Sequence, residues 1–200
     1  MIDEEIKKLK QLIIELSYKS KEGHIASAFS ILDILYILYN EILRIRTHDV
    51  HLDNEDTFIL SKGHASLALY AILYKNGYFT LKELMTFCDY NSPFGGHPDK
   101  NKIAGVSAST GSLGHGLPVS VGIAMGNKIK ENDSKTFVLV GDGELNEGSN
   151  WEAILLASNH RLNNLICVVD HNKSTDRTLK IDDLKDKFYS FGWDVDEIDG

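Results

Sequence analysis

Residues 136–172, TFVLVGDGELNEGSNWEAILLASNHRLNNLICVVDHN, decide the fold of this chain. Two continuous apolar runs, 136–140 and 165–169, are typical of strands that are buried on both faces of a sheet. The stretch 148–160 between them is predicted to be a helix. Strand, helix and strand in this order form a βαβ unit, so we expect an α/β fold: a parallel sheet covered by helices on both faces.

The sequence on either side of this unit predicts further elements. Residues 88–111 are rich in Gly, Pro, Asn and Ser, and they indicate a long ordered loop. Apolar periodicity predicts helices over 2–20, 27–43, 148–160 and 182–190, another helix within 61–78, a strand at 57–60 and a last strand at 193–198.

A helix is also predicted over 112–131, although this stretch carries Gly114, Gly116, Gly122 and Gly126. Each glycine inside a helix costs about 1 kcal/mol relative to alanine. We therefore expect another part of the protein to approach this helix closely.

Composition excludes several classes of protein. The chain has 200 residues with 21 Lys+Arg against 29 Asp+Glu, and this net charge of −8 argues against a nucleic-acid partner. Two cysteines are too few for a disulfide framework. We expect the charged start, MIDEEIKKLK, to be an amphipathic helix and not a signal peptide. We also expect no apolar run of the about 18 residues that a membrane span needs. We expect a cytoplasmic protein without a membrane partner.

The domain organisation is expected to be simple. The residues 1–200 suit a single domain. Because the chain ends just after the strand predicted at 193–198, we expect that this domain is either truncated or completed by another chain.

Polar clusters follow both strands of the βαβ unit. Gly141, Asp142 and Gly143 come after the first strand, and DHN, ending at Asn172, follows the second. Ligands of parallel sheets bind outside the carboxyl ends of the strands. Asp142 and Asn172 offer hard oxygen ligands that suit Mg²⁺ or Ca²⁺, and the two glycines allow backbone amides to approach a phosphate. Either triplet alone is a commonplace turn, but together they favour a diphosphate site.

Five segments in this order resemble the transketolase family. GDG followed by Asn172 is similar to the thiamine diphosphate (ThDP) motif, and the form LGHG at 113–116 resembles the N-terminal, diphosphate-binding subunit of split transketolases. The resembling segments are EGHIASAFSILDILYILY, LSKGHASLALYAIL, GGHPD, STGSLGHGLPVSVGIAMGNK and GDGELNEGSNWEAILLASNHRLNNLICVVDHNKS.

This resemblance implies a fold and an activity. The fold would be the ThDP-binding fold of the pyrophosphate-binding type. The activity would be transfer of a two-carbon ketol unit from a ketose phosphate to an aldose acceptor, with ThDP and Mg²⁺. It would require a C-terminal partner subunit that carries the pyrimidine-binding domain, in a homodimer or a heterotetramer.

The resemblance also implies residues for the cofactor. Asp142 and Asn172 would bind Mg²⁺ through their side chains, and Ser174 through its backbone carbonyl. Gly141 and Gly143 would lie at the diphosphate. The backbones of Gly111 and Leu113 would contact the aminopyrimidine ring.

The catalytic residues implied by the resemblance are His24, His64, His97 and Glu147. The histidines would face cofactor and substrate, with His64 contacting both, and Glu147 would lie at the dimer interface. His115 is also a glycine-flanked histidine within a resembling segment, and its role is left open. After His24 the sequence reads GHIA where many transketolases have GHPG, which leaves the substrate preference open.

Three alternatives stay open at this point. The first is another ThDP enzyme, such as a 1-deoxyxylulose-5-phosphate synthase or a decarboxylase. The second is a non-catalytic ThDP-binding protein that serves assembly. The third, a nucleotide-binding α/β domain, ranks last because the sequence has neither GxGxxG nor GxxxxGK[ST].

Overall fold

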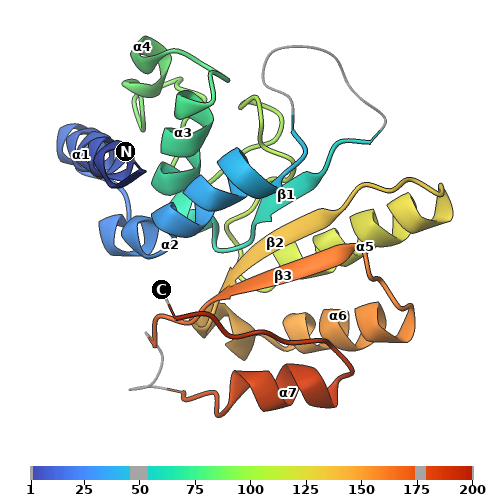
Figure 1. Cartoon of the computed structure of the whole chain (residues 1–200). Helices are drawn as coiled ribbons and strands as arrows, with labels where there is room; N and C mark the ends of the chain where they lie inside the picture. Colours follow the sequence, from blue (N-terminus) through green and yellow to red (C-terminus); the bar gives the residue numbers. More distant parts are fainter. Residues whose placement is uncertain (1, 46–53, 174–178, 200) are drawn as a thin grey trace.

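Parallel strands form the sheet at the centre of the chain (Figure 1). The computed structural model describes residues 2–45, 54–173 and 179–199. Within these ranges the strands are β1 (Thr57–Leu60), β2 (Thr136–Gly141) and β3 (Leu165–Asp170), in the order β1-β2-β3. All pairs are parallel, with Leu60 opposite Leu139 and Gly141 opposite Asp170. The predicted parallel sheet is confirmed.

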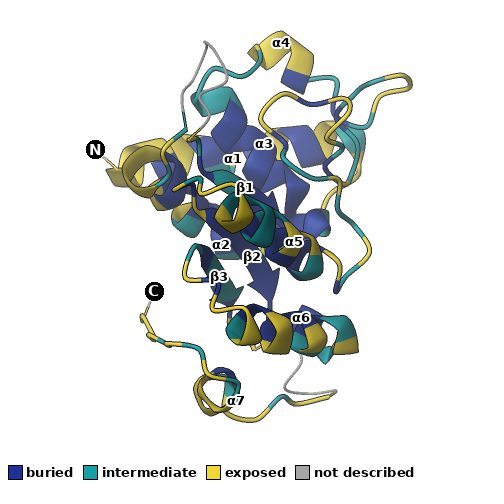
Figure 2. Ribbon diagram, turned by 90° about the vertical axis from the view of Figure 1, so that its right-hand side faces the viewer, coloured by how far each residue is buried: buried dark blue, intermediate teal, exposed yellow. Residues whose placement is uncertain are grey.

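Helices cover both faces of this sheet, as expected (Figures 1 and 2). On one side lie α1 (Ile2–Ser20), α2 (Ile25–Ile37) and α3 (Ser66–Lys75), and α4 (Leu81–Leu84) packs beyond α3. On the other side lie α5 (Gly116–Ile129), α6 (Gly148–Asn159) and α7 (Leu184–Ser190). A π-helix, Leu38–Ile42, extends α2, and short 3₁₀ helices occupy Gly63–Ala65 and Gly143–Asn146.

Two hydrophobic cores lie on opposite faces of the sheet because successive strand residues point in opposite directions. In β2, Phe137 and Leu139 pack with α1, α2 and α3, while Val138 and Val140 pack with α5 and α6. β2 is buried along its whole length, as the middle strand should be. This double burial explains why its sequence is continuously apolar rather than alternating.

The predicted strand at 193–198 is wrong: the structure has no strand there. Trp193 instead packs edge-on against Phe188, with ring centroids 5.7 Å apart, and its Nε1 donates to the Ile154 carbonyl at 3.0 Å. Trp193 and Val195 therefore contribute to the core by side-chain packing on α6 and α7. Their apolar spacing reflects that contact and not a strand ladder.

The stretch Ile25–Ile42 is long and apolar enough to cross a membrane, judged by length and composition alone. The expectation that no apolar run reaches this length is therefore wrong. In the structure, Ala28, Ile31, Leu32 and Leu35 of this stretch are buried in the core with α1 and α3. The same composition is found in the core helices of folded domains.

The glycine-rich helix begins at Gly116, and the structure explains some of its glycines. A Cβ on Gly116 would overlap the Ser61 side chain, so a close approach is present at that position, as expected. Apart from the neighbouring backbone of the helix itself, no heavy atom of the described residues lies within 4 Å of a Cβ position on Gly122 or Gly126. For these two glycines the expected neighbour is not found within the described residues.

Candidate functional site

The carboxyl ends of β2 and β3 bring the predicted metal ligands to one edge of the sheet. Asp142 follows β2 and is buried, and its backbone N–H donates to the Asp170 carbonyl at 3.0 Å. The Gly143 amide donates to Asp142 Oδ1 at 2.7 Å. This carboxylate therefore sits where the chain turns from β2 into the 3₁₀ helix.

Asn172 lies at the same edge, just beyond β3. Its Nδ2 donates to Asp170 Oδ2 at 2.9 Å. The amide oxygen of Asn172 therefore points away from Asp170. Asp142 and Asn172 provide hard oxygen donors, the chemistry that suits Mg²⁺ bound together with a diphosphate. Ser174, the third predicted ligand, lies outside the described residues. Among the described residues, no group of three His, Cys, Asp or Glu side chains could hold a metal ion by itself.

A buried ion pair, which sequence reasoning missed, lies beside these ligands. Lys62 Nζ is 2.6 Å from Asp170 Oδ2, and both residues are almost completely buried. Ser30 of α2 donates to the same carboxylate oxygen at 2.7 Å. The sequence places Lys62 just after the predicted strand 57–60, at the carboxyl edge of a parallel sheet, but it does not indicate which carboxylate Lys62 meets.

The three predicted histidines come together from separate segments. His24 precedes α2, and its ring centroid lies 5.2 Å from that of His64 in an edge-on arrangement. A Cβ on Gly111 would lie 3.0 Å from the His97 ring, which places His97 against the predicted aminopyrimidine loop. The charges of His24 and His97 also act on His64. The structure therefore brings the three histidines and Gly111 into one cluster.

The surroundings of His64 favour its neutral form. Burial, reinforced by the positive charges of Lys62, His24 and His97, lowers the pKa of His64 to about 4. The imidazole of His64 is therefore neutral at pH 7. A neutral imidazole has one donor and one acceptor nitrogen, so it can accept a proton or orient a polar group.

The loop that carries Gly111 and Leu113 is fixed by a second residue that sequence reasoning missed. Glu144 is buried, and its Oε1 accepts hydrogen bonds from the Gly114 amide at 2.9 Å and from the Ser61 hydroxyl. Burial raises the pKa of this carboxyl, while the hydrogen bonds oppose that effect. The sequence feature that could have identified Glu144 is its position in GDGELN, directly after Gly143 at the end of β2.

Glu147 is exposed at the start of α6, and its side chain makes no capping hydrogen bond. A Cβ on Gly114 would lie 2.6 Å from Glu147 Cβ, so this glutamate packs against the same loop. Its exposure is compatible with the predicted interface role, which stays a prediction.

His115 follows the loop that carries Gly111 and Leu113. It is exposed before α5, with Nδ1 3.1 Å from the Leu113 carbonyl oxygen.

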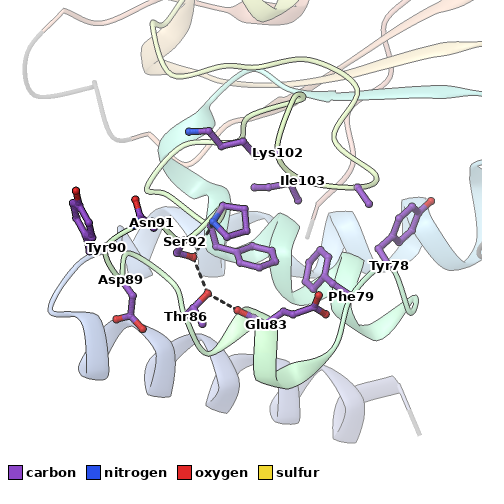
Figure 3. Close-up of a pocket in the computed structure, with 13 residues that line it drawn as sticks. Tyr78, Phe79, Glu83, Thr86, Asp89, Tyr90, Asn91, Ser92, Lys102 and Ile103 are labelled. Atoms are coloured by element: carbon purple, nitrogen blue, oxygen red, sulfur yellow. Dashed lines mark hydrogen bonds between the residues drawn. The ribbon is translucent and has the colours of Figure 1, made fainter.

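A separate cavity of about 540 Å³ lies in the loop region around α4 (Figure 3). Phe79 and Phe94 stack edge-on at its wall, with ring centroids 4.7 Å apart. None of the predicted cofactor or catalytic residues lines this cavity. The predicted site is therefore at the sheet edge and not in this cavity.

The sequence matches the family described as "Transketolase, thiamine diphosphate binding domain" over residues 2–200. An apulose-4-phosphate transketolase subunit of Phocaeicola vulgatus is 37% identical over 198 residues, covering 96% of this chain and 70% of the relative. The 6-deoxy-6-sulfo-D-fructose transketolase subunit SqwG of a Clostridium species is 34% identical, with 96% and 72% covered.

A solved structure agrees with these sequence matches. The transketolase from Leishmania mexicana superimposes with a TM-score of 0.88 at 28% identity. The match covers 96% of this chain but 31% of that transketolase. The chain therefore spans less than a third of a long transketolase and about seven-tenths of each of the two relatives named above.

Proposed function

The chain belongs to the transketolase family as its thiamine diphosphate-binding domain, and from this membership we propose that it is the cofactor-holding subunit of a two-chain transketolase. The observation that carries the proposal is that His64, which contacts His24, lies two residues after Lys62, and Lys62 pairs with Asp170 at the sheet edge that also carries Asp142. The reaction would move a two-carbon ketol unit from a ketose phosphate to an aldose.

In this proposal Asp142 and Asn172 would hold Mg²⁺ beside the diphosphate of ThDP. Glycines 141 and 143 keep side chains away from the diphosphate, while the Gly111–Leu113 backbone supports the aminopyrimidine ring. When bound, ThDP would supply the carbon nucleophile for the transfer. In this proposal the chain's own residues position the cofactor, and they accept or donate protons beside it.

The three histidines are proposed to have different roles toward the substrate. His64, which is neutral at pH 7, accepts a proton or a hydrogen bond from a sugar hydroxyl. His24 and His97 are more exposed and contact the sugar oxygens from the solvent side. Three imidazoles around one site suit a substrate rich in hydroxyl groups.

The proposed partner is a C-terminal subunit with the pyrimidine-binding domain, since the relatives named above are themselves called subunits of transketolases. One face of α5 supports this proposal. Val119 and Ile129 are exposed there at 45% and 76%, and Gly122 and Gly126 lie between them on the same face. Such a face allows a helix of another chain to approach closely. A cytoplasmic location also stays a prediction.

Calorimetric titration of the chain with ThDP and Mg²⁺, with and without the C-terminal subunit, tests this function. We expect binding that requires the partner and is lost in Asp142→Ala, whereas Asp196→Ala, an exposed carboxylate, binds like the wild type. Product analysis with a ketose phosphate and with pyruvate separates ketol transfer from decarboxylation. ThDP binding without turnover of either substrate would indicate a non-catalytic assembly role instead.

A further inference from the structure

Three donors from three separate segments converge on one carboxylate oxygen beside the predicted metal site. Asp170 Oδ2 accepts from Lys62 Nζ at 2.6 Å, from Ser30 Oγ at 2.7 Å and from Asn172 Nδ2 at 2.9 Å. Lys62 also donates to Ser30 Oγ at 3.3 Å. The relative exposure of Asp170 is 6% and that of Lys62 is 2%, so the ion pair is shielded from water, whereas Asn172 itself is exposed.

The chemistry of this contact fixes the orientation of Asn172. A carboxylate paired with a lysine ammonium offers only acceptor oxygens. The Asn172 group that faces Asp170 must therefore be the NH₂, and the amide oxygen must point away from Asp170. An asparagine binds Mg²⁺ through its oxygen and never through its amide nitrogen, so the wrong orientation would remove a ligand.

We propose that Asp170 is a positioning residue for the metal ligand Asn172, and that Lys62 and Ser30 hold the Asp170 carboxylate in place. The proposal rests on the function proposed above. It also explains why a buried ion pair is kept at this edge. Lys62 lies two residues before His64, and Ser30 lies on the helix that follows His24, so the same carboxylate links the metal edge to the histidine segments.

A double-mutant cycle tests whether Asp170 acts through Asn172. The first change is Lys62→Met with Asp170→Asn, which removes both charges together and leaves no unpaired buried ion. The second change is Asn172→Asp, which provides an oxygen in either orientation of the side chain. Mg²⁺ affinity is measured by calorimetry at saturating ThDP, on the chain assembled with its C-terminal partner.

We expect the first change to weaken Mg²⁺ binding about 10- to 100-fold when residue 172 is Asn, as is usual for residues that orient a ligand. With Asn172→Asp present, the same change should weaken binding about twofold or less, the scatter of uncoupled sites. Equal weakening in both backgrounds would overturn the proposal, because Asp170 would then act on the fold and not on the amide.

Thermal unfolding of all four proteins shows whether each one folds. If the Lys62→Met/Asp170→Asn protein does not fold, Ser30→Ala replaces it, because it removes one donor and leaves the ion pair. Its smaller loss of Mg²⁺ affinity should likewise disappear with Asn172→Asp, and persistence of that loss would overturn the proposal. Failure of the wild type to bind Mg²⁺ with ThDP would overturn the proposed function as well, whereas wild-type binding without coupling overturns the positioning role alone.

Discussion

His64 illustrates how the fold changes the chemistry of a single side chain. An unperturbed histidine has a pKa near 6.5, but burial and the neighbouring charge of Lys62 lower this pKa to about 4. In the free chain the imidazole should therefore stay neutral across the physiological range. Carbon-detected NMR of the histidine rings would measure this, and titration of His64 near pH 6.5 would contradict it.

The same shift predicts a dependence of stability on pH. Because the pKa of His64 is lower in the folded chain, the unfolded chain takes up the proton first as the pH falls. The contribution of His64 to the free energy of unfolding is thus complete above about pH 6.5 and is lost progressively toward pH 4. Chemical denaturation at several pH values should show a shallower slope in this window for His64→Gln than for the wild type. His160→Gln, an exposed position, is the control.

Gly111 is predicted to tolerate no side chain. Its φ is +151°, and a Cβ would lie 3.0 Å from the His97 ring. We expect Gly111→Ala to lower the free energy of unfolding by about 1–3 kcal/mol and to displace His97. The matched control is Gly122→Ala in α5, where a Cβ has open space and alanine should stabilise the helix by about 0.5–1 kcal/mol. Equal effects of the two substitutions would contradict this account of the loop.

The loop before α5 depends on a hydrogen bond between elements. Glu144, in the 3₁₀ helix after β2, accepts from the Gly114 amide and from Ser61 after β1. Glu144→Ala leaves these buried donors without an acceptor, and each unsatisfied group costs about 1–3 kcal/mol. We expect a loss of unfolding free energy of about that size, measured by urea denaturation.

Glu144→Gln is the informative comparison for this prediction. Its amide oxygen can still accept from Gly114 or Ser61, so it should lose less stability than Glu144→Ala. If both substitutions left stability unchanged, the loop would be held by other contacts.

The helix α4 shows which local signal escaped sequence reasoning. Thr80 and Glu83 form a capping box, in which Thr80 Oγ1 accepts from the Glu83 amide and Glu83 Oε2 accepts from the Thr80 amide. The Thr-x-x-Glu pattern is readable from sequence, but a single helical turn carries little apolar periodicity.

Assembly is the property of the whole molecule that the proposed function requires. Leu155 and Leu156 of α6 are exposed at 57% and 45%, on the helix that packs beside α5. We expect Leu155→Lys to leave the unfolding temperature of the isolated chain nearly unchanged, because the side chain is already exposed. The same substitution should weaken binding to the C-terminal subunit.

Tyr18→Lys on α1 provides the control for this prediction, because Tyr18 is 86% exposed on a helix that covers the other side of the sheet (Figure 1). Light scattering and a ketol-transfer assay of the reconstituted pair would measure assembly and activity. Full assembly and activity of the Leu155→Lys chain would place the interface elsewhere. Robust activity of the wild-type chain alone would remove the need for a partner.

The sequence by itself determined the architecture around residues 136–172. Continuous apolar runs have few structural solutions, so the two strands, the helix between them and the polar edge followed from local pattern. The same reasoning pointed to Asp142 and Asn172, because strand ends are visible in the primary structure, whereas the histidine segments came from the resemblance to transketolases.

The tertiary structure alone decided which distant residues meet. The Lys62–Asp170 pair joins residues 108 positions apart, and the Glu144–Gly114 bond joins residues 30 positions apart. In the stretch 193–198, Trp193 and Val195 pack through their side chains, and the stretch does not pair as a strand. The physical reason is that burial, hydrogen-bond partners and pKa shifts depend on neighbours in space, and no local periodicity records those neighbours.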